Sequence, residues 1–199
     1  VYIDDFDASQ NKIDLRDPQS WKLSSIPVGF AGYEYGNNDL RAGYNRARLS
    51  WYTIDPIFYS SRRPNDISLD EISKNSSRRI FIDEIFPEID LYQGESRIQS
   101  TFDLTYYPDE KGPYNNNQEL DFKSDNKKNW SGITRKINST NFKKTNVEYI
   151  QFWLLDDFSN NNSSDLKIGE ILFHLGNISE DILPDGKKQF ENGLPNNNE

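Results

Sequence analysis

The segment from Ile98 to Tyr107 shows the cleanest alternation of apolar and polar residues in the chain. One set of alternate positions is apolar except at Ser100, with Ile98, Phe102, Leu104 and Tyr106 on the same face. A period of two is typical of an antiparallel strand that buries one face and exposes the other. The pattern therefore predicts a β-strand whose apolar face packs on a core.

Four further segments carry strand signals. They are Val1–Phe6, Arg48–Ile54, Val147–Leu155 and Leu166–Leu175. Asp55-Pro56 ends the second, because an Asp-Pro pair favours the start of a turn. The third is apolar on both faces, which predicts a central strand covered on both sides. The fourth changes parity at Gly169, which predicts a β-bulge.

Helical signals are few and short. Ser68–Lys74 begins with a serine followed three residues later by Glu71, the pattern of a capping box. Ser139–Lys144 and Ser179–Leu183 are each long enough for about one turn. The expected strands are separated by Gly, Pro and Asn turn residues and by long loops. This organisation predicts an all-β fold, namely an antiparallel β-sandwich of jelly-roll type with few short helices. We expect residues 1–195 to form a single such domain, excised from a much longer chain, and residues 196–199 to be a disordered tail.

Composition narrows the class of protein. Apolar residues make up only 34% of the 199 residues, but aromatic residues contribute 14%, and large rings bury much area each. The net charge of −9 disfavours nucleic acid as a partner, because an acidic surface repels phosphates. The chain has no Cys, which rules out disulfides and thiolate metal sites. No stretch approaches the roughly 20 apolar residues of a membrane helix.

Three aspartates near the start are the best candidates for metal ligands. Asp4, Asp5 and Asp7 are closely spaced carboxylates at the end of an expected strand, and Asp156 and Asp157 end another. Calcium prefers several oxygen ligands, so these residues are candidate ligands of a structural calcium ion, which is the only candidate cofactor. The spacing does not match an EF-hand loop, and aspartates at strand ends commonly cap turns. The turn interpretation is favoured.

No pattern of a catalytic site is present. A glycosidase needs two carboxylates at a fixed separation, and none of the 32 acidic residues is marked out by a surrounding motif. His174 is the only histidine, and no Gly-x-Ser-x-Gly motif exists to pair with it. We therefore expect no catalytic residues and no enzymatic activity, and we interpret His174 as an exposed or hydrogen-bonded strand residue.

The tryptophans offer a different kind of site. Trp51 and Trp153 lie inside expected strands, which predicts that they belong to the core. Trp21 and Trp130 lie outside them and are the candidates for exposed rings that stack on sugars. A carbohydrate-binding module is therefore the alternative to a purely structural role.

Several long stretches together resemble one protein family. They are residues 2–15, 21–27, 46–59, 83–91, 102–115, 129–137, 147–158 and 173–195. In this order they are similar to the SprA/Sov family, the giant outer-membrane translocons of the type IX secretion system, which also act in gliding motility. The acidic opening also resembles the first strand of carbohydrate-binding jelly-rolls.

The resemblance implies a role that no single motif shows. Family members form a very large β-barrel through which folded cargo leaves the cell. It implies a folded, non-catalytic insertion in a barrel loop at the outer membrane and cell surface, with the extracellular side favoured over the periplasm. The implied partners are the rest of the parent barrel, other translocon subunits and secreted cargo proteins.

Overall fold

The computed structural model describes residues 13–35, 39–118, 122–123, 126–137, 150–155 and 169–184. The chain divides into two compact units, each assembled from three separate segments. Unit 1 comprises Val1–Arg16, Thr53–Asp103 and Ile137–Phe173, and unit 2 comprises Asp17–Tyr52, Leu104–Lys136 and His174–Glu199. No helix in the part of the chain that the structure describes is long and apolar enough to cross a membrane.

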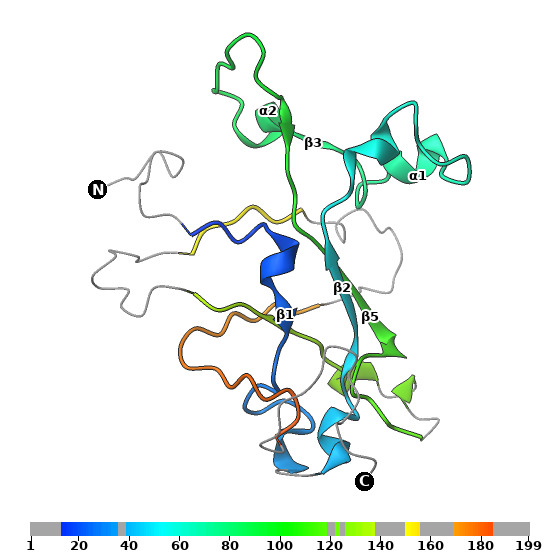
Figure 1. Cartoon of the computed structure of the whole chain (residues 1–199), viewed down its shortest axis with the longest axis vertical. Coiled ribbons are helices and arrows are strands. Elements are labelled where there is room, and N and C mark those ends of the chain that lie inside the picture. The colour runs from blue at the N-terminus through cyan, green and yellow to red at the C-terminus, as the bar shows by residue number, and fades with distance from the viewer. Residues whose placement is uncertain are drawn as a thin grey trace. The chain divides into compact units, whose positions relative to one another are not determined.

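Unit 2 contains the longest pair of strands. β2 (Ala47–Tyr52) lies beside β5 (Asp103–Lys111), as Figure 1 shows. Arg48 bonds to Glu110 and Tyr52 to Thr105, so the two strands run in opposite directions. β1 (Lys22–Leu23) and β6 (Ile133–Thr134) form a second antiparallel pair.

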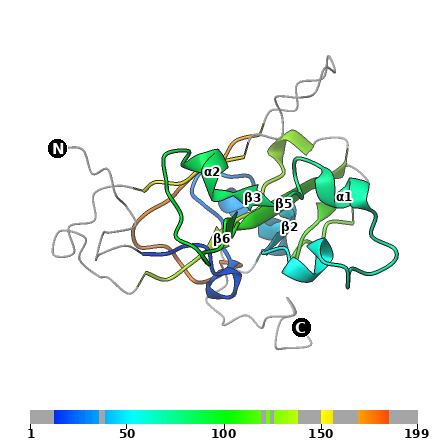
Figure 2. The same ribbon diagram turned by 90° about the horizontal axis from the view of Figure 1, so that it is seen from above.

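Unit 1 is built from short elements. β3 (Ile80–Phe81) pairs antiparallel with β4 (Ile98–Gln99). α2 (Ile82–Ile85) follows β3 directly and lies beside it in both views (Figures 1 and 2). α1 (Leu69–Ser73) confirms the helix expected from the capping box: Ser68 accepts a bond from the Glu71 N–H, and the Glu71 carboxylate accepts one from the Ser68 N–H.

Short 3₁₀ helices connect these elements, at Pro18–Ser20, Tyr33–Tyr35, Leu40–Gly43, Pro56–Tyr59 and Asn126–Lys128. Three of them begin after an aspartate whose side chain accepts a backbone N–H two residues ahead: Asp17, Asp39 and Asp55. Aspartate caps such turns because its short carboxylate reaches the unpaired N–H groups of the first turn. Asp55 and the proline after it also end β2 near the expected place.

The single strand expected over Ile98–Tyr107 is wrong in two respects. The chain leaves the β3–β4 sheet after Gln99 and begins β5 at Asp103, because the two parts pair with different strands. The apolar face of β5 is also its more exposed face. Leu104 and Tyr106 are 48% and 42% exposed, whereas the alternate positions are half-buried.

The two most apolar segments are not strands where the structure describes them. Residues 150–155 and 169–175 have no regular secondary structure, so the expected central strand and the bulged strand at Gly169 are wrong for these residues. The helical turn expected over residues 179–183 is wrong, because residues 179–181 have no regular structure and residues 182–184 form bends. The expected elements at Val1–Phe6 and Ser139–Lys144 lie outside the described residues.

The hydrophobic core lies in unit 2. Ile26, Ala42 and Trp130 pack together, and the half-buried Phe30 packs against them. The other buried hydrophobic residues, Ala47, Tyr114, Phe122 and Leu183, also belong to unit 2. Among the described residues, unit 1 buries no hydrophobic side chain to this degree. The described structure is thus β-rich, with small antiparallel sheets, short helices and one aromatic-centred core.

Candidate functional site

The core of unit 2 contains a positive charge. Arg46 precedes β2 and forms an isolated parallel bridge with Trp130. The Trp130 N–H donates to the Asn45 carbonyl (3.0 Å), and the Ala47 N–H donates to the Trp130 carbonyl (2.8 Å). The Gly112 N–H donates to the Arg46 carbonyl (3.0 Å). Two distant segments, at Gly112 and Trp130, therefore fix the backbone around Arg46.

The Arg46 side chain lies over the Trp130 ring. Its guanidinium carbon is 4.6 Å from the ring centroid, the geometry of a cation–π contact. The indole N–H of Trp130 donates to the Ala31 carbonyl (3.0 Å), and Phe30 meets the ring edge-on at 5.6 Å. Trp130 is 6% exposed, so the expectation that its ring is exposed for sugar stacking is wrong. The ring instead faces an internal cation.

Burial dominates the electrostatics of Arg46. The residue is fully buried, and burial lowers the pKa of its guanidinium to about 10, a shift that the nearby Tyr114 opposes. Its Nη2 donates to the Ile182 carbonyl at 3.4 Å, while Nε and Nη1 have no hydrogen-bond partner among the residues that the structure describes. Because the group is closed off from solvent, we interpret it as a structural cation rather than a ligand-binding residue.

The sequence offered no signal for this arrangement. Arg46 and Arg48 occupy equivalent alternate positions in the same run, yet their environments differ. Arg48 is half-exposed, pairs with Glu110 at 2.6 Å and lies 4.6 Å from the Tyr107 ring centroid. Arg46 is buried and Arg48 lies at the surface because residues 130 and 182 pack against Arg46.

The remaining tryptophans also depart from expectation. Trp153, expected in the core, is 64% exposed. Trp51 is half-buried, and its indole N–H donates to the Pro18 carbonyl (3.1 Å). Trp21, the other candidate for sugar stacking, is half-buried.

A second candidate site is an apolar surface in unit 1. It is formed by residues 150–155 and 169–173, which we call the apolar segments. Their exposed side chains are Ile150, Phe152, Trp153, Leu154, Leu155, Ile171, Leu172 and Phe173, each between 43% and 66% exposed. Phe152 and Phe173 lie 5.1 Å apart by ring centroid, which places the two segments side by side. Side chains that large are rarely left in water as a contiguous group unless another molecule covers them.

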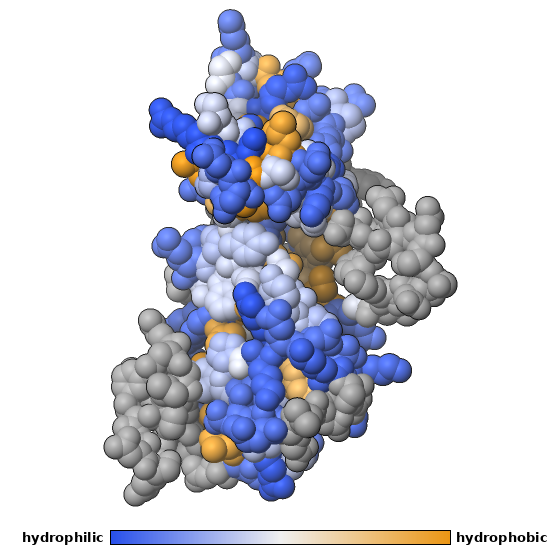
Figure 3. All heavy atoms as spheres, turned by 90° about the vertical axis from the view of Figure 1, so that its right-hand side faces the viewer, coloured by the Kyte–Doolittle hydropathy of each residue, from blue (hydrophilic) through white to orange (hydrophobic). Residues whose placement is uncertain are grey.

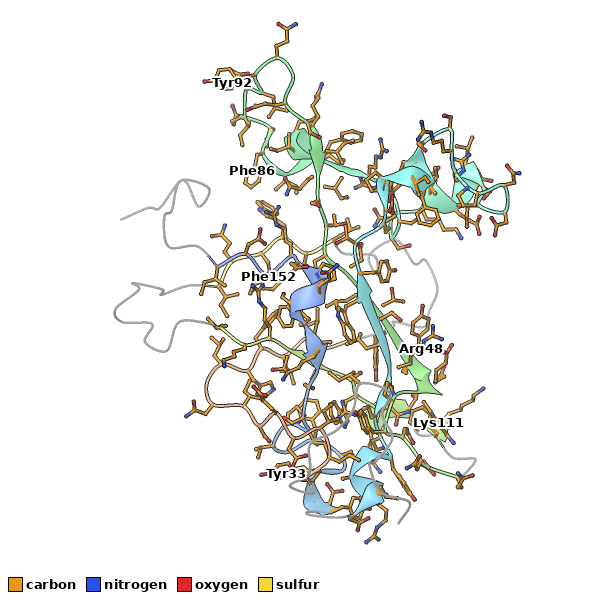
Figure 4. All side chains as sticks on the ribbon, in the orientation of Figure 1. Tyr33, Arg48, Phe86, Tyr92, Lys111 and Phe152 are labelled. Carbon is orange, nitrogen blue, oxygen red and sulfur yellow. The ribbon has the colours of Figure 1, made fainter. Side chains whose placement is uncertain are left out.

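The apolar segments are anchored to unit 1 by aromatic contact. Trp153 meets Phe86, just after α2, edge-on with centroids 5.8 Å apart. Figure 4 shows Phe86 and Phe152 on their separate segments, and Tyr92, 81% exposed, in the loop after α2. On the face that Figure 3 presents, apolar patches interrupt a mainly hydrophilic surface. Unit 1 therefore presents apolar surface that its own described residues leave open.

The backbone of the apolar segments is also unpaired. Within the described part of the chain, no N–H or C=O of residues 150–155 or 169–173 makes a hydrogen bond. Exposed backbone donors and acceptors that no described residue pairs are a template for pairing with another strand. The apolar segments thus combine apolar side chains with open backbone groups.

The described residues assemble no group of three or more metal-ligating side chains. Asp4, Asp5 and Asp7 lie outside the described residues, as do Asp156 and Asp157, so the calcium site stays a prediction. His174 is exposed, and its ring lies 6.3 Å from that of Phe30.

No protein-family model and no curated protein matches this chain. The site is therefore defined by its own geometry: an aromatic-centred core in unit 2 and an open apolar surface in unit 1.

Proposed function

We propose that this chain is a non-catalytic structural and interaction module of the type IX outer-membrane translocon, supporting protein export and gliding motility. The resemblance of its long stretches to the SprA/Sov family supports the biological role. The observation that carries the interaction role is the exposure of the apolar segments, which is greatest at Trp153 and Leu154, 64% and 66%.

The proposed mechanism is contact rather than chemistry. Unit 2 supplies a packed core, while unit 1 lacks buried hydrophobic side chains in its described part and presents its apolar residues outward. Covering such a surface is favourable because apolar area leaves water. The proposed partners are the rest of the parent barrel, other translocon subunits and secreted cargo proteins, at the cell surface. We also propose that the small sheets belong to a jelly-roll sandwich.

The test is made in cells that carry the full-length parent protein. Trp153→Glu and Phe173→Glu each place a charge on the apolar surface, so cargo secretion and gliding should fall severalfold. Tyr92→Glu is the matched control, because Tyr92 is an exposed aromatic of unit 1 outside the apolar segments. Normal secretion in a strain that lacks residues 1–195 would refute the proposal.

Carbohydrate binding is the alternative that the sequence suggested. One of its two candidate residues, Trp130, is buried and cannot stack on a sugar. Trp130 is engaged by Arg46 and Phe30 inside the core, and Trp21 is half-buried. No observation on the described residues favours a sugar site, so we propose no second function.

A further inference from the structure

We infer that residues 150–155 and 169–173 form an incomplete β-sheet that binds an extended apolar strand from another protein by backbone hydrogen bonding. This inference rests on the proposed interaction role and specifies how the contact is made. The occupant is a strand with apolar side chains and basic flanking residues.

The side chains indicate a strand from the interior of a sheet. In residues 150–155, Ile150, Phe152 and Leu154 occupy one parity, and Trp153 and Leu155 occupy the other. All five are at least 43% exposed. Strands that are apolar on both faces belong in sheets covered on both sides. The apolar segments therefore have the composition of central strands and the exposure of uncovered ones.

The backbone supplies the means of recognition. The N–H and C=O groups of both segments are free of hydrogen bonds within the described part of the chain. In β-strand addition, an incoming peptide bonds to such groups, and its alternate side chains pack against those of the receiving strand. A partner that bound only through apolar side chains would leave the unpaired backbone groups under it without water or protein partners.

The two segments are already close enough to act together. The Phe152 and Phe173 rings are 5.1 Å apart and tilted by 40°, the spacing of an aromatic pair on neighbouring strands. An incoming strand that pairs with one segment would find the aromatic side chains of the other beside it. A single strand of about six residues would be long enough to pair along either segment.

The acidic charge of the chain favours some binding partners over others. The chain has a net charge of −9, Glu170 lies exposed in one segment, and Asp156-Asp157 follows the other in the sequence. A strand flanked by Lys or Arg is attracted to this surface, whereas a second copy of the same acidic chain is repelled. The charge pattern thus favours a basic-flanked strand of a different protein.

The first test uses the full chain and a labelled probe peptide. The probe alternates Val and Ile over about nine residues and carries two Lys at each end. Fluorescence anisotropy should show saturable binding, and amide hydrogen exchange should slow in residues 150–155 and 169–173. A probe with the same side chains but N-methylated backbone amides should bind at least tenfold more weakly. Equal binding of the two probes, or no binding of the first, would overturn the inference.

Proline variants of the chain test whether the backbone N–H groups of the apolar segments bond to the probe. Leu154→Pro and Leu172→Pro each remove an N–H that makes no hydrogen bond among the described residues, so both variants should fold as the parent does. Their affinity for the probe should fall more than tenfold, while Leu154→Ala and Leu172→Ala, which keep the N–H, should lose only a few-fold. Proline variants that bind as well as the alanine variants would refute strand addition.

The outcome separates this inference from the proposed function. If the Trp153→Glu and Phe173→Glu strains lose secretion while the proline strains keep it, the interaction role stands and backbone pairing is refuted. Sedimentation that shows the chain dimerising through the apolar segments would identify a second copy as the occupant and overturn the choice of a different protein.

Discussion

At the scale of single residues, Arg46 places a charge inside the core of unit 2. Burial disfavours the charged guanidinium, which is why its pKa falls well below the usual arginine value, to about 10. A shift of this size corresponds to about 3 kcal/mol at neutral pH. The cation–π contact with the face of Trp130 offsets about 2 kcal/mol of this desolvation cost. The two effects nearly balance, so the charge itself adds little to stability.

This balance predicts how the free energy of unfolding responds when the charge of Arg46 is removed but an apolar side chain of similar length is kept. Arg46→Met should leave the free energy of unfolding within about 1 kcal/mol of the parent value, because methionine fills the space without a desolvation penalty. Arg46→Ala should lower it by about 2–3 kcal/mol, since it opens a cavity beside Trp130. Urea denaturation at pH 7 measures both.

Arg48→Met is the matched control for Arg46→Met. It removes a half-exposed pair with Glu110 and should change the free energy of unfolding by less than about 1 kcal/mol. A loss of several kcal/mol in Arg46→Met would show that the guanidinium has an anionic partner in the folded chain.

Asp103, the first residue of β5, predicts a pH dependence. Burial raises the pKa of its carboxyl, although bonds from the Thr101 hydroxyl and the Ile54 N–H oppose the shift. The folded pKa thus exceeds the unfolded one, and the folded state binds more protons between them. The stability contribution is fully present below the unfolded pKa and is lost as pH rises through the folded pKa.

Asp103→Asn should therefore raise the urea midpoint at pH 7 and have a smaller effect at pH 3, where the aspartate is already protonated. Asp66→Asn, at an exposed position, is the control and should shift neither midpoint measurably. A larger gain at pH 3 than at pH 7 would contradict the assignment.

At the scale of elements, strand ends are fixed by close backbone approach. Gly112 follows β5, and a side chain there would collide with the Ala47 carbonyl at the start of β2. The collision involves backbone on both sides, so it cannot be relieved by a side-chain rotation. Glycine is thus required where the β2–β5 pair meets the Arg46 bridge.

Gly112→Ala should consequently lower the free energy of unfolding by about 2 kcal/mol or more. Gly169→Ala is the matched control, because no described atom beyond its chain neighbours lies within 4 Å of the Cβ it would add, and its φ is not in the left-handed region. That variant should be neutral or stabilise slightly by restricting the unfolded chain. Thermal melting of both variants decides the point.

At the scale of the whole molecule, the two units differ in how they are held together. The buried hydrophobic residues of the described part all lie in unit 2, where Trp130 is the largest. Unit 1 relies on short elements and on aromatic contacts such as that between Phe86 and Trp153. Local stability follows buried contacts and enclosed backbone bonds, so it should be uneven along the chain.

Hydrogen exchange of the full chain tests this difference. The amides of Ala47, Gly112 and Trp130, which are bonded around Arg46, should exchange at least about a hundredfold more slowly than unbonded ones. The amides of residues 150–155 and 169–173 should exchange quickly in the absence of a partner. Strong protection of the apolar segments in the isolated chain would show that it covers them itself.

The sequence by itself determined the features that depend on neighbouring residues. It predicted the β-rich class, the end of β2 shortly before Asp55-Pro56 and the capping box of Ser68 and Glu71. These are local because a turn or a cap is closed by side chains two or three residues apart. The proposed family role also comes from the order of its long stretches.

Only the tertiary structure decided which aromatic and charged side chains are buried. Trp130 is buried whereas Trp153 is exposed, and Arg46 is buried whereas Arg48 is half-exposed. The periodicity of the sequence predicts neither difference. The break between β4 and β5 is equally invisible in an alternating run. Burial and strand partners depend on segments far apart in the chain, such as residues 46, 130 and 182, and their meeting is set by packing rather than by local pattern.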